Sequence, residues 1–443
     1  MTENRYFYIY TFGCQMNVHD SEQMAEILRR SGYLPARDPK QADIILVNTC
    51  SIREKAEQKA YSLLGRLRRL KKGGPRLILG MTGCLAQQWG EEFPKRIPGL
   101  DLVIGTHNIH LLPGMIARVQ TCGMPVVETS FREEVESIGI VAPPENGGVS
   151  AFVTVMQGCD NFCAYCVVPH LRGREQSRRP EDILDEIRIL AGRGIKEITL
   201  LGQNVNSYGA SFGNGYDFAS LLREAAGVGG IERIRFTTSH PKDLSERITR
   251  CFAEIGSLCE HIHLPVQSGS DSVLARMNRG YTAAEYVKKV DKLRQMCSNI
   301  SITSDMIVGF PGETEKDFRQ TIGLMERVRF DGLFSFRYSD RPGTAAAAFA
   351  DKVEDKVKEE RLSELQKLQD RITLEKHEAA VGSLEEVLIE GYSRNSRADI
   401  SGRTRKNKIV NVEGGPEWIG KTVPVRIEGA YLHSLRGKLI ERD

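Results

Sequence analysis

Strand-like and helical stretches alternate along the first part of this 443-residue chain. Four short apolar runs occur within its first 105 residues, each followed by a stretch of helical character: residues 6–11, 43–48, 77–81 and 102–104. Such alternation is typical of parallel α/β units, because each crossover between parallel strands needs a helix. It predicts an open parallel α/β sheet in an N-terminal domain, residues 1–122.

A cysteine follows each of the first three runs. Cys14, Cys50 and Cys84 are separated by 36 and 34 residues. The carboxyl ends of parallel strands lie side by side, and open α/β sheets bind their ligands beyond those ends. The alternative is three inert buried cysteines, since a free thiol packs as a small hydrophobe. Three thiols at equivalent positions favour a metal cluster.

A second set of cysteines follows the apolar run 152–156. Cys159, Cys163 and Cys166 have the spacing C-x3-C-x2-C. A cubane iron–sulfur cluster takes four ligands, so three thiolates leave one iron open to a small chelating molecule. Zinc is the alternative, but tetrahedral zinc sites usually add a second cysteine pair or histidines, and His170 is poorly placed for this. The spacing favours an iron–sulfur cluster.

Six further strand-like runs with helical stretches between them predict a partial (β/α)6 barrel: residues 152–156, 197–201, 231–236, 261–265, 301–308 and 333–337. We place this barrel in residues 150–345, after a linker of residues 123–149. Polar and glycine-rich segments follow successive strands. Because barrel active sites lie at the carboxyl ends of strands, these segments are expected to contact a cofactor; the alternative is that they are ordinary loops.

The composition changes after residue 345. Residues 346–382 are charged and helical, as in a connector. Residues 383–443 contain strand-like runs separated by turns, which predict a small antiparallel β-barrel. Between residues 392 and 410 there are six Arg or Lys and one Asp. We interpret this range as a flexible basic loop that binds nucleic acid, helped by Tyr392 and Asn407; the alternative is a solubilising surface.

The overall charge limits what the chain can bind. The net charge is only +3, so contacts with nucleic acid must come from local basic patches. Arg172 and Arg174 form one candidate patch. Contact with a phosphate backbone and a solvated helix entrance are two interpretations of this patch, and the sequence favours neither. No apolar stretch approaches the length of a membrane span, and the first residues lack the character of a signal or transit peptide. We therefore expect a cytoplasmic protein with reduced cysteines.

The cysteine loop of residues 158–166 closely resembles the signature of the radical S-adenosylmethionine superfamily. Nearly the whole chain resembles one of its families, the methylthiotransferases, and specifically the tRNA-modifying MiaB branch. The stretches that carry this resemblance are residues 11–17 (TFGCQMN), 158–169 (GCDNFCAYCVVP), 172–174 (RGR) and 402–408 (GRTRKNK). Ala164, His170 and Asp340 depart from the usual pattern, and none of them is a cysteine.

The resemblance implies a definite set of cofactors and sites. It assigns Cys14, Cys50 and Cys84 to an auxiliary [4Fe-4S] cluster, and Cys159, Cys163 and Cys166 to a radical-generating [4Fe-4S] cluster that binds S-adenosylmethionine. Cofactor contacts are expected from seven residues: Tyr165, Gln203, Asn204, Ser239, Gln267, Ser268 and Asp305. The terminal barrel resembles the TRAM domain, for which we expect RNA contacts from Arg403, Arg405, Lys406 and Lys408, together with Arg172 and Arg174.

The implied reaction is methylthiolation of carbon 2 of N6-isopentenyladenosine, next to the anticodon of tRNA. S-Adenosylmethionine would be both methyl donor and radical source, and no side chain alone would be catalytic. We expect a monomer that binds the anticodon stem-loop and takes electrons from a flavodoxin or ferredoxin. The alternatives are a sister methylthiotransferase acting on threonylcarbamoyl-adenosine or a ribosomal-protein aspartate, a radical enzyme whose second cluster relays electrons, and a non-enzymatic RNA-binding iron–sulfur scaffold.

Overall fold

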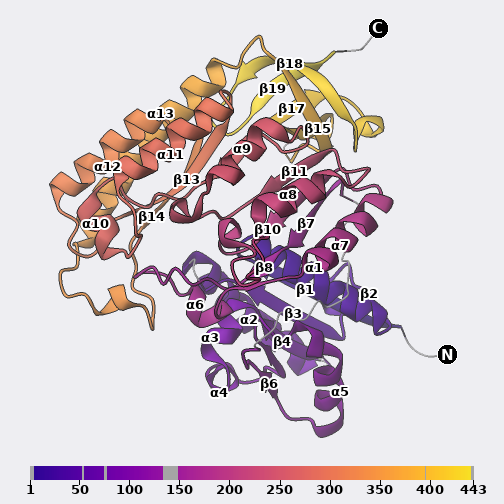
Figure 1. Cartoon of the computed structure of the whole chain (residues 1–443). Coiled ribbons are helices and arrows are strands. Elements are labelled where there is room, and N and C mark those ends of the chain that lie inside the picture. The colour runs from indigo at the N-terminus through magenta and orange to yellow at the C-terminus, as the bar shows by residue number, and fades with distance from the viewer. Residues whose placement is uncertain (1–3, 52–53, 74–76, 133–147, 395, 441–443) are drawn as a thin grey trace. The chain divides into compact units, whose positions relative to one another are not determined.

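A computed structural model describes residues 4–51, 54–73, 77–132, 148–394 and 396–440 (Figure 1). The chain divides into two compact units. The first comprises residues 1–145, 152–160 and 167–183, and the second comprises residues 146–151, 161–166 and 184–443. Residues 133–147, most of the expected linker, lie outside the described residues.

A six-stranded parallel sheet forms the centre of the first unit. Its strand order is β2-β1-β3-β4-β5-β6. The strands are β1 (Arg5–Phe12), β2 (Tyr33–Pro35), β3 (Ile44–Thr49), β4 (Ile78–Thr82), β5 (Leu102–Ile104) and β6 (Val126–Glu128). The open parallel sheet is thus confirmed.

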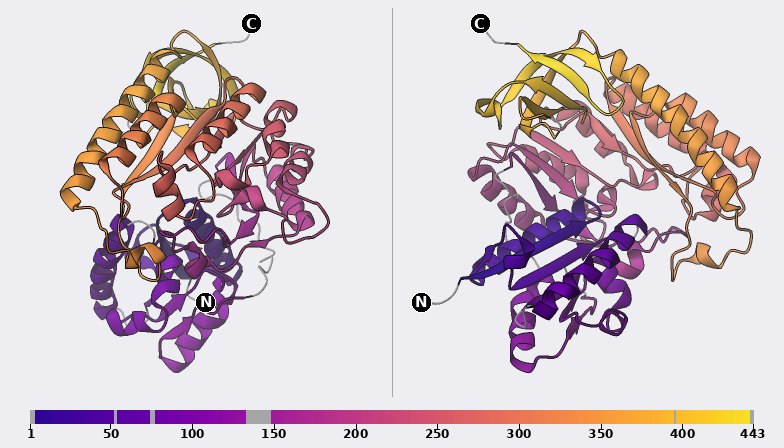
Figure 2. Two further views of the ribbon diagram at one scale, coloured as in Figure 1. Left: turned by 60° about the vertical axis from the view of Figure 1, so that its left-hand side comes forward. Right: turned by 180° about the vertical axis from the view of Figure 1, so that it is seen from behind.

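Helices cover both faces of this sheet (Figure 2). One apolar core packs α1 and α5 against alternate residues of the strands, and a second core packs α2 and α3 against the opposite face. The strands β3, β4 and β5 are buried on both faces, so they read as largely continuous apolar runs. The helices are α1 (Gln15–Arg30), α2 (Glu54–Gly73), α3 (Cys84–Trp89), α4 (Glu92–Arg96) and α5 (Leu112–Cys122), with short 3-10 turns at Pro39–Gln41 and Ile109–Leu111.

The two edge strands of the sheet were not predicted. Both β2 (YLP) and β6 (VVE) contain three residues of which one is buried, whereas the equally short β5 (LVI) is buried throughout, so only β5 stands out as an apolar run. Strand β6 also lies within residues 123–149, the range interpreted as a linker. It pairs in parallel with β5 through Leu102 and Val126, so the sheet extends beyond the predicted boundary at residue 122.

The segments on either side of the cysteine loop of residues 158–166 add to the first unit. Strand β8 (Met156–Gln157) pairs with β9 (Gln176–Ser177), and the short helix α6 (Val168–Arg172) lies between them in sequence. Cys84, Val167 and Leu171 form a small apolar cluster. Thr106 Oγ1 donates a hydrogen bond to the carbonyl of Leu171 at 2.7 Å. These contacts fix α6 against the carboxyl ends of the sheet strands.

The six strands expected of a partial barrel are present, and all of them lie in the second unit except β7, of which residues 152–154 belong to the first unit. They form two parallel three-stranded sheets, β11-β10-β7 and β12-β13-β14, joined by a bridge between Ile234 and Leu258. The strands are β7 (Ser150–Thr154), β10 (Glu197–Leu201), β11 (Arg233–Phe236), β12 (His261–His263), β13 (Ser301–Val308) and β14 (Gly332–Arg337). The helices are α7 (Pro180–Gly192), α8 (Phe218–Ala226), α9 (Glu246–Glu254), α10 (Asp271–Arg276), α11 (Ala283–Met296) and α12 (Glu315–Val328). Short 3-10 turns lie at Val205–Ser207, Pro241–Asp243 and Ala345–Ala348.

The charged stretch after the barrel is one long helix, α13 (Asp355–Glu378). It packs along α12 and β14 (Figure 1). Arg361, Leu365, Leu368 and Ile372 are buried on it, at the three- and four-residue spacing of one helix face. The predicted connector is therefore part of the packed unit. Of the helices described, none has the length and apolar character needed to cross a membrane.

The C-terminal strands close into a barrel in the order β15-β16-β17-β19-β18, drawn in yellow tones in Figure 2. They are β15 (Leu384–Tyr392), β16 (Asp399–Thr404), β17 (Ile409–Glu413), β18 (Thr422–Ala430) and β19 (Leu435–Leu439), with a 3-10 turn at Pro416–Trp418. The antiparallel barrel is confirmed. The flexible loop expected for residues 392–410 is wrong in part, because β16 and the start of β17 lie within it. A Cβ on Gly402 would come within 2.2 Å of the Leu388 carbonyl oxygen, so glycine is needed where β16 crosses β15.

Candidate metal centres and cofactor site

The three N-terminal cysteines follow adjacent strands of the sheet in the first unit. Cys50 comes directly after β3, and Cys14 and Cys84 come two residues after β1 and β4, which flank β3. Cys14 caps the N-terminus of α1, and Cys84 is the first residue of α3. The predicted register of these cysteines is therefore confirmed, and all three thiols belong to the carboxyl edge of one sheet.

Buried amides hold the turns that carry these cysteines. Asn17 Oδ1 accepts from the Cys14 amide at 3.3 Å, and Asn17 Nδ2 donates to Asn48 Oδ1 at 3.1 Å. Asn48 Nδ2 donates in turn to the Asn17 carbonyl and to Ser21 Oγ, at 2.8 and 2.9 Å. Both asparagines are fully buried. This network joins the end of β3 to the start of α1, so it fixes the positions of Cys14 and Cys50.

Glycines allow the cysteine turns to approach one another closely. Gly13 has φ of +136°, and a Cβ there would lie 2.6 Å from the Cβ of Cys50. Gly83 has φ of +83°, and a Cβ there would lie 2.3 Å from Asn48 Oδ1. Both positions combine a left-handed backbone with backbone or side-chain contact, which only glycine tolerates. The residues that precede two of the three cysteines are thus dictated by the site.

The thiol environments suit a multi-iron cluster. A hydrogen bond with the Cys50 side chain lowers the pKa of Cys14 to about 6, while burial raises the pKa of Cys84. Thiolates are the ligands of iron–sulfur clusters. Within the described part of the chain, no three His, Cys, Asp or Glu side chains are grouped tightly enough around one point to hold a single metal ion. In a cubane each cysteine binds a different iron, and the three thiols at this sheet edge give the number of protein ligands that leaves one iron open.

Arg172 lies beside these cysteines and not on the surface. Its side chain is 5% exposed, and its Nη2 donates to Asp20 Oδ2 at 2.7 Å. Helix α6, which Arg172 ends, packs on Cys84 through Val167 and Leu171. The expectation that Arg172 contacts RNA is therefore wrong, because a buried, paired guanidinium cannot reach a phosphate. Arg174, by contrast, is 72% exposed and pairs with Asp160.

The second cysteine set is divided between the two units. Cys159 belongs to the first unit, where its amide donates to the Gly173 carbonyl at 3.3 Å. Cys163 and Cys166 belong to the second, where the Cys166 amide donates to the Cys163 carbonyl at 2.9 Å. The Ala164 amide donates to the Met277 carbonyl. The loop is thus anchored to the turn that follows α10.

A buried arginine lies against Cys163. Arg279 is 4% exposed, and its Nη1 donates to Cys163 Sγ and to the Tyr165 hydroxyl, each at 3.4 Å. Its other donors go to the Pro265 carbonyl and to the Tyr281 hydroxyl. No carboxylate among the described residues forms an ion pair with it. A buried cation with neutral protein partners beside a thiol is placed to bind an anionic group.

Several predicted cofactor contacts follow the barrel strands as expected. Ser239 lies after β11, is 3% exposed, and its hydroxyl is a buried atom that no group in the described structure satisfies. Gln267 lies after β12 with φ of +74°, and its neighbouring-loop counterpart Thr238 has φ of +68°. Non-glycine residues with such a left-handed backbone conformation are strained, and strained residues of this kind cluster at ligand sites. Gln203 follows β10, and Tyr165 receives the hydrogen bond from Arg279.

Asn204 and Ser268 do not fit the predicted role of cofactor contacts. Asn204 Nδ2 donates to Asp243 and Ser207, and its Oδ1 accepts from the His240 amide. Ser268 is buried and its hydroxyl is bonded to Thr321 Oγ1 at 3.3 Å.

Both side chains are occupied within the protein, so they hold loops in place. Asp305 is partly exposed, and its carboxylate lies 3.4 Å from His263 Nε2.

The four basic residues of the terminal barrel are also engaged within the second unit: Arg403, Arg405, Lys406 and Lys408. Arg405 makes a bidentate ion pair with Glu260 and donates to two backbone carbonyls. Lys408 Nζ donates to the Asp331 carbonyl at 2.8 Å. Lys406 and Arg403 pair with Glu385 and Glu390. Their expected contact with RNA stays a prediction; in the structure these charges fasten the terminal barrel to the (β/α) strands and to itself.

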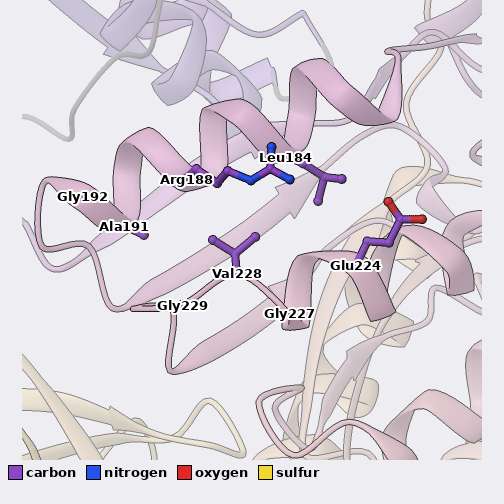
Figure 3. Close-up of a pocket in the computed structure, with 8 residues that line it drawn as sticks. All are labelled: Leu184, Arg188, Ala191, Gly192, Glu224, Gly227, Val228 and Gly229. Carbon is purple, nitrogen blue, oxygen red and sulfur yellow. The ribbon is translucent and has the colours of Figure 1, made fainter.

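A hollow in the second unit lies away from this chemistry (Figure 3). It is bordered by the end of α7 and the turn after α8, and Val228 points into it. These segments precede β10 and β11, so the hollow is at the amino ends of the strands. Its lining contains no cysteine, and the candidate site residues lie beyond the opposite ends of the same strands.

Comparisons with known proteins identify three family models along the chain. Residues 6–105 match an uncharacterised protein family, UPF0004, residues 153–325 match the radical SAM superfamily, and residues 378–440 match the TRAM domain. These ranges cover most of the sheet that carries Cys14, Cys50 and Cys84, most of the partial barrel, and the terminal barrel.

Curated relatives match the chain from end to end. A tRNA-2-methylthio-N(6)-dimethylallyladenosine synthase of Syntrophus aciditrophicus is 56% identical over 438 residues, 99% of this chain and 95% of the relative. The enzyme of the same name from Geobacter metallireducens is 54% identical over 440 residues, 99% of each chain. The chain belongs to this family. Its members carry the name of a tRNA-modifying enzyme.

Solved structures of more distant proteins share the fold of this synthase family. The radical S-adenosylmethionine methyltransferase TsrM from Kitasatospora setae aligns with a TM-score of 0.56 at 15% identity, covering 87% of this chain and 81% of TsrM. The cobalamin-dependent radical enzyme OxsB aligns with a TM-score of 0.55 at 13% identity, covering 83% and 56%. At these identities the similarity concerns the fold alone.

Sequence reasoning missed three residues of the synthase site. Asn17 and Asn48 stand within the segments that carry the N-terminal cysteines, but an asparagine gives no signal of burial. Arg279 stands far from any cysteine in sequence. The turn after α10 brings it to Cys163, and only the fold shows this.

Proposed function

We propose that this chain is a methylthiotransferase that converts N6-isopentenyladenosine, also called N6-dimethylallyladenosine, to its 2-methylthio derivative. This nucleoside lies next to the anticodon of tRNA. The observation that carries the proposal is the N-terminal cysteine set, Cys14, Cys50 and Cys84. A radical enzyme needs only the C-x3-C-x2-C loop, whereas this chain also presents three thiols on adjacent strands of a separate sheet. Relatives more than half identical over almost the whole chain support this assignment.

We assign the auxiliary [4Fe-4S] cluster to Cys14, Cys50 and Cys84. The glycines before Cys14 and Cys84 let the cysteine turns approach one another closely, and the buried asparagines hold the turns in place. Three protein ligands leave one iron open, where a sulfur atom can be bound and presented. Full protein ligation would suit an electron relay instead. The three-cysteine set therefore favours sulfur transfer over relay.

We assign the second [4Fe-4S] cluster to Cys159, Cys163 and Cys166, with S-adenosylmethionine on its open iron. When bound, the cluster and cofactor together supply the carbon radical that opens an unactivated C–H bond. Arg279 provides a buried positive charge for an anionic group next to Cys163. The unsatisfied hydroxyl of Ser239, the side chain of Gln267 and the Tyr165 hydroxyl supply hydrogen-bonding groups at the strand ends. These residues bind and orient, and none transfers the methylthio group itself.

The substrate adenine must leave its stack before carbon 2 can be reached. Unstacking costs less in a single-stranded loop than in a duplex, so an anticodon loop is a suitable substrate. An external one-electron donor of the flavodoxin or ferredoxin class would supply the electron.

The end of the terminal barrel that faces solvent is the proposed tRNA contact. In β15 and β16, Val387 pairs with Thr404 and Tyr392 pairs with Ile400, so the two ends of this hairpin are opposite. The Thr404 end is fastened by Arg405 and Lys408. The Tyr392 end leads into a loop in which Arg394 and Arg397 are exposed. Tyr392 is itself 51% exposed and offers a ring for stacking on a base.

Replacement of Arg394 and Arg397 by Gln is expected to weaken tRNA binding and to reduce the slope of log affinity against log salt by roughly 1 to 2, because up to two phosphates would lose their counter-charge. Filter binding at several salt concentrations measures this slope. The matched control is replacement of Arg403 and Lys406 by Gln, which removes two paired charges and should leave the slope unchanged. A slope that falls only in the control would place the RNA contact at the other end of the barrel.

The proposed reaction is tested by mass spectrometry of tRNA nucleosides after anaerobic incubation with reductant and S-adenosylmethionine. Substrate tRNA that carries N6-dimethylallyladenosine should give its 2-methylthio derivative. Methylthiolated threonylcarbamoyl-adenosine in its place would assign the chain to the sister activity. Cleavage of S-adenosylmethionine without any change in tRNA would leave a radical enzyme of another reaction class, and absence of cleavage would favour the RNA-binding scaffold.

A further inference from the structure

A buried ion pair accompanies the N-terminal cysteines. Arg172 of α6 and Asp20 of α1 are 5% and 8% exposed in their side chains and are bonded at 2.7 Å. Their backbones are fixed independently of this bond. Asp20 lies within α1, which Cys14 caps, and the Arg172 carbonyl oxygen lies 3.0 Å from His107 Nε2. The pair is therefore held rigidly beside the sheet edge that carries the cysteines.

Such a pair needs an explanation other than stability. Removing two charges from water costs several kcal/mol per ion, and well-packed apolar side chains often replace a buried pair without loss. The surroundings supply one. Arg172 is the last residue of α6, and Val167 and Leu171 beside it form an apolar cluster with Cys84. Helix α6 lies in contact with α3, which Cys84 begins. The buried guanidinium is therefore close to this cysteine, and its positive charge acts on Cys84 and on Cys14.

We propose that Arg172, held in place by Asp20, is a positioning residue of the auxiliary cluster: it donates to the cysteine sulfur and raises the reduction potential of the cluster by compensating its negative charge. The inference rests on the auxiliary cluster of the proposed function. Thiolate ligation makes such a cluster anionic, and hydrogen bonds to sulfur and nearby charge set its potential. A positive charge favours the reduced state, which carries one more electron.

The experiment uses the full chain with Cys159, Cys163 and Cys166 replaced by Ala, so that only the auxiliary cluster is present. After anaerobic reconstitution, iron is counted and the midpoint potential is measured by electron paramagnetic resonance during a redox titration. In this parent, Arg172→Met should lower the potential by an amount equal to at least a tenfold change in the reduction equilibrium, about 59 mV for one electron. Asp20→Asn should raise the potential, because it removes the opposing charge.

Further variants separate charge from structure. Arg172→Lys keeps the positive charge and should remain closer to the parent than Arg172→Met. The matched control is Arg174→Met, two residues away, which removes the same charge from an exposed position and should not move the potential. If Arg172→Met does not hold the cluster, Asp20→Asn and Arg172→Lys give the answer: the first removes the opposing charge and should raise the potential, and the second keeps the positive charge and should stay close to the parent.

The outcomes distinguish this inference from the function on which it rests. A parent that binds no iron would refute the auxiliary cluster itself. A parent that binds iron, with Asp20→Asn and the Arg172 variants titrating at its potential, would refute the role of Arg172 alone. Shifts of equal sign for Arg172→Met and Asp20→Asn would also overturn it, because they would reflect a disturbed structure and not a change of charge.

Discussion

Replacement of Cys159, Cys163 and Cys166 by Ala is expected to abolish cleavage of S-adenosylmethionine and to leave about half of the bound iron, on the basis of two four-iron clusters. The cofactor then has no open iron to bind, while Cys14, Cys50 and Cys84 remain on their own sheet. Production of 5′-deoxyadenosine and the iron content of the reconstituted protein measure the two effects. No methylthiolated tRNA should form.

The matched control replaces three cysteines that lie outside both sets. Cys251, Cys259 and Cys297 are buried, and nothing in their surroundings groups them together. Alanine there should leave both iron content and cleavage intact, with a loss of stability of roughly 1 kcal/mol per site from the small cavity. If the radical-loop variant instead lost all of its iron, the two sets would share a single site, and the assignment of separate clusters would be wrong.

Replacement of Cys14, Cys50 and Cys84 by Ala is expected to give the opposite division. Cleavage of S-adenosylmethionine should persist, because Cys163 and its buried partner Arg279 belong to the other unit. Iron should fall to about half, and methylthiolated product should fall below detection, at least a hundredfold, since no sulfur is held for transfer. Both products are measured in one reaction by mass spectrometry.

The informative quantity is the ratio of the two products. An electron-relay role for the auxiliary cluster predicts that cleavage and tRNA modification fall together. Sulfur transfer predicts that cleavage continues without modification. Formation of the methylthio product by a variant that has lost all three cysteines would remove the auxiliary cluster from the reaction.

The predictable features of the site follow from the order of strands and cysteines along the sequence. Strand ends in a parallel sheet are adjacent, so a cysteine after each of three successive strand-like runs had to lie on one edge, and Cys14, Cys50 and Cys84 do. The C-x3-C-x2-C loop is likewise local. The six barrel strands were recognisable because their apolar runs are long enough to show a period. The short edge strand β6 was not.

The features of the site that were not predicted concern charged side chains, whose binding partners are set only by the fold. Arg172, Arg405 and Lys408 look in sequence like a basic surface, but their carboxylate and carbonyl partners come from Asp20, Glu260 and Asp331, far away in the chain. A sequence shows the charge and not its partner.

The same limit applies to polar residues after the strands. Asn204 is saturated by its neighbours, whereas the Ser239 hydroxyl is left open for a ligand.

Radical activation of carbon 2 of the adenine is tested by following the hydrogen atom that this carbon loses. The substrate is tRNA in which N6-dimethylallyladenosine carries deuterium at that carbon, incubated anaerobically with the full chain, reductant and S-adenosylmethionine. We expect 5′-deoxyadenosine to gain one deuterium as the 2-methylthio nucleoside forms, because the radical takes the atom that the methylthio group replaces. Methylthio product formed alongside deuterium-free 5′-deoxyadenosine would contradict radical activation of this bond.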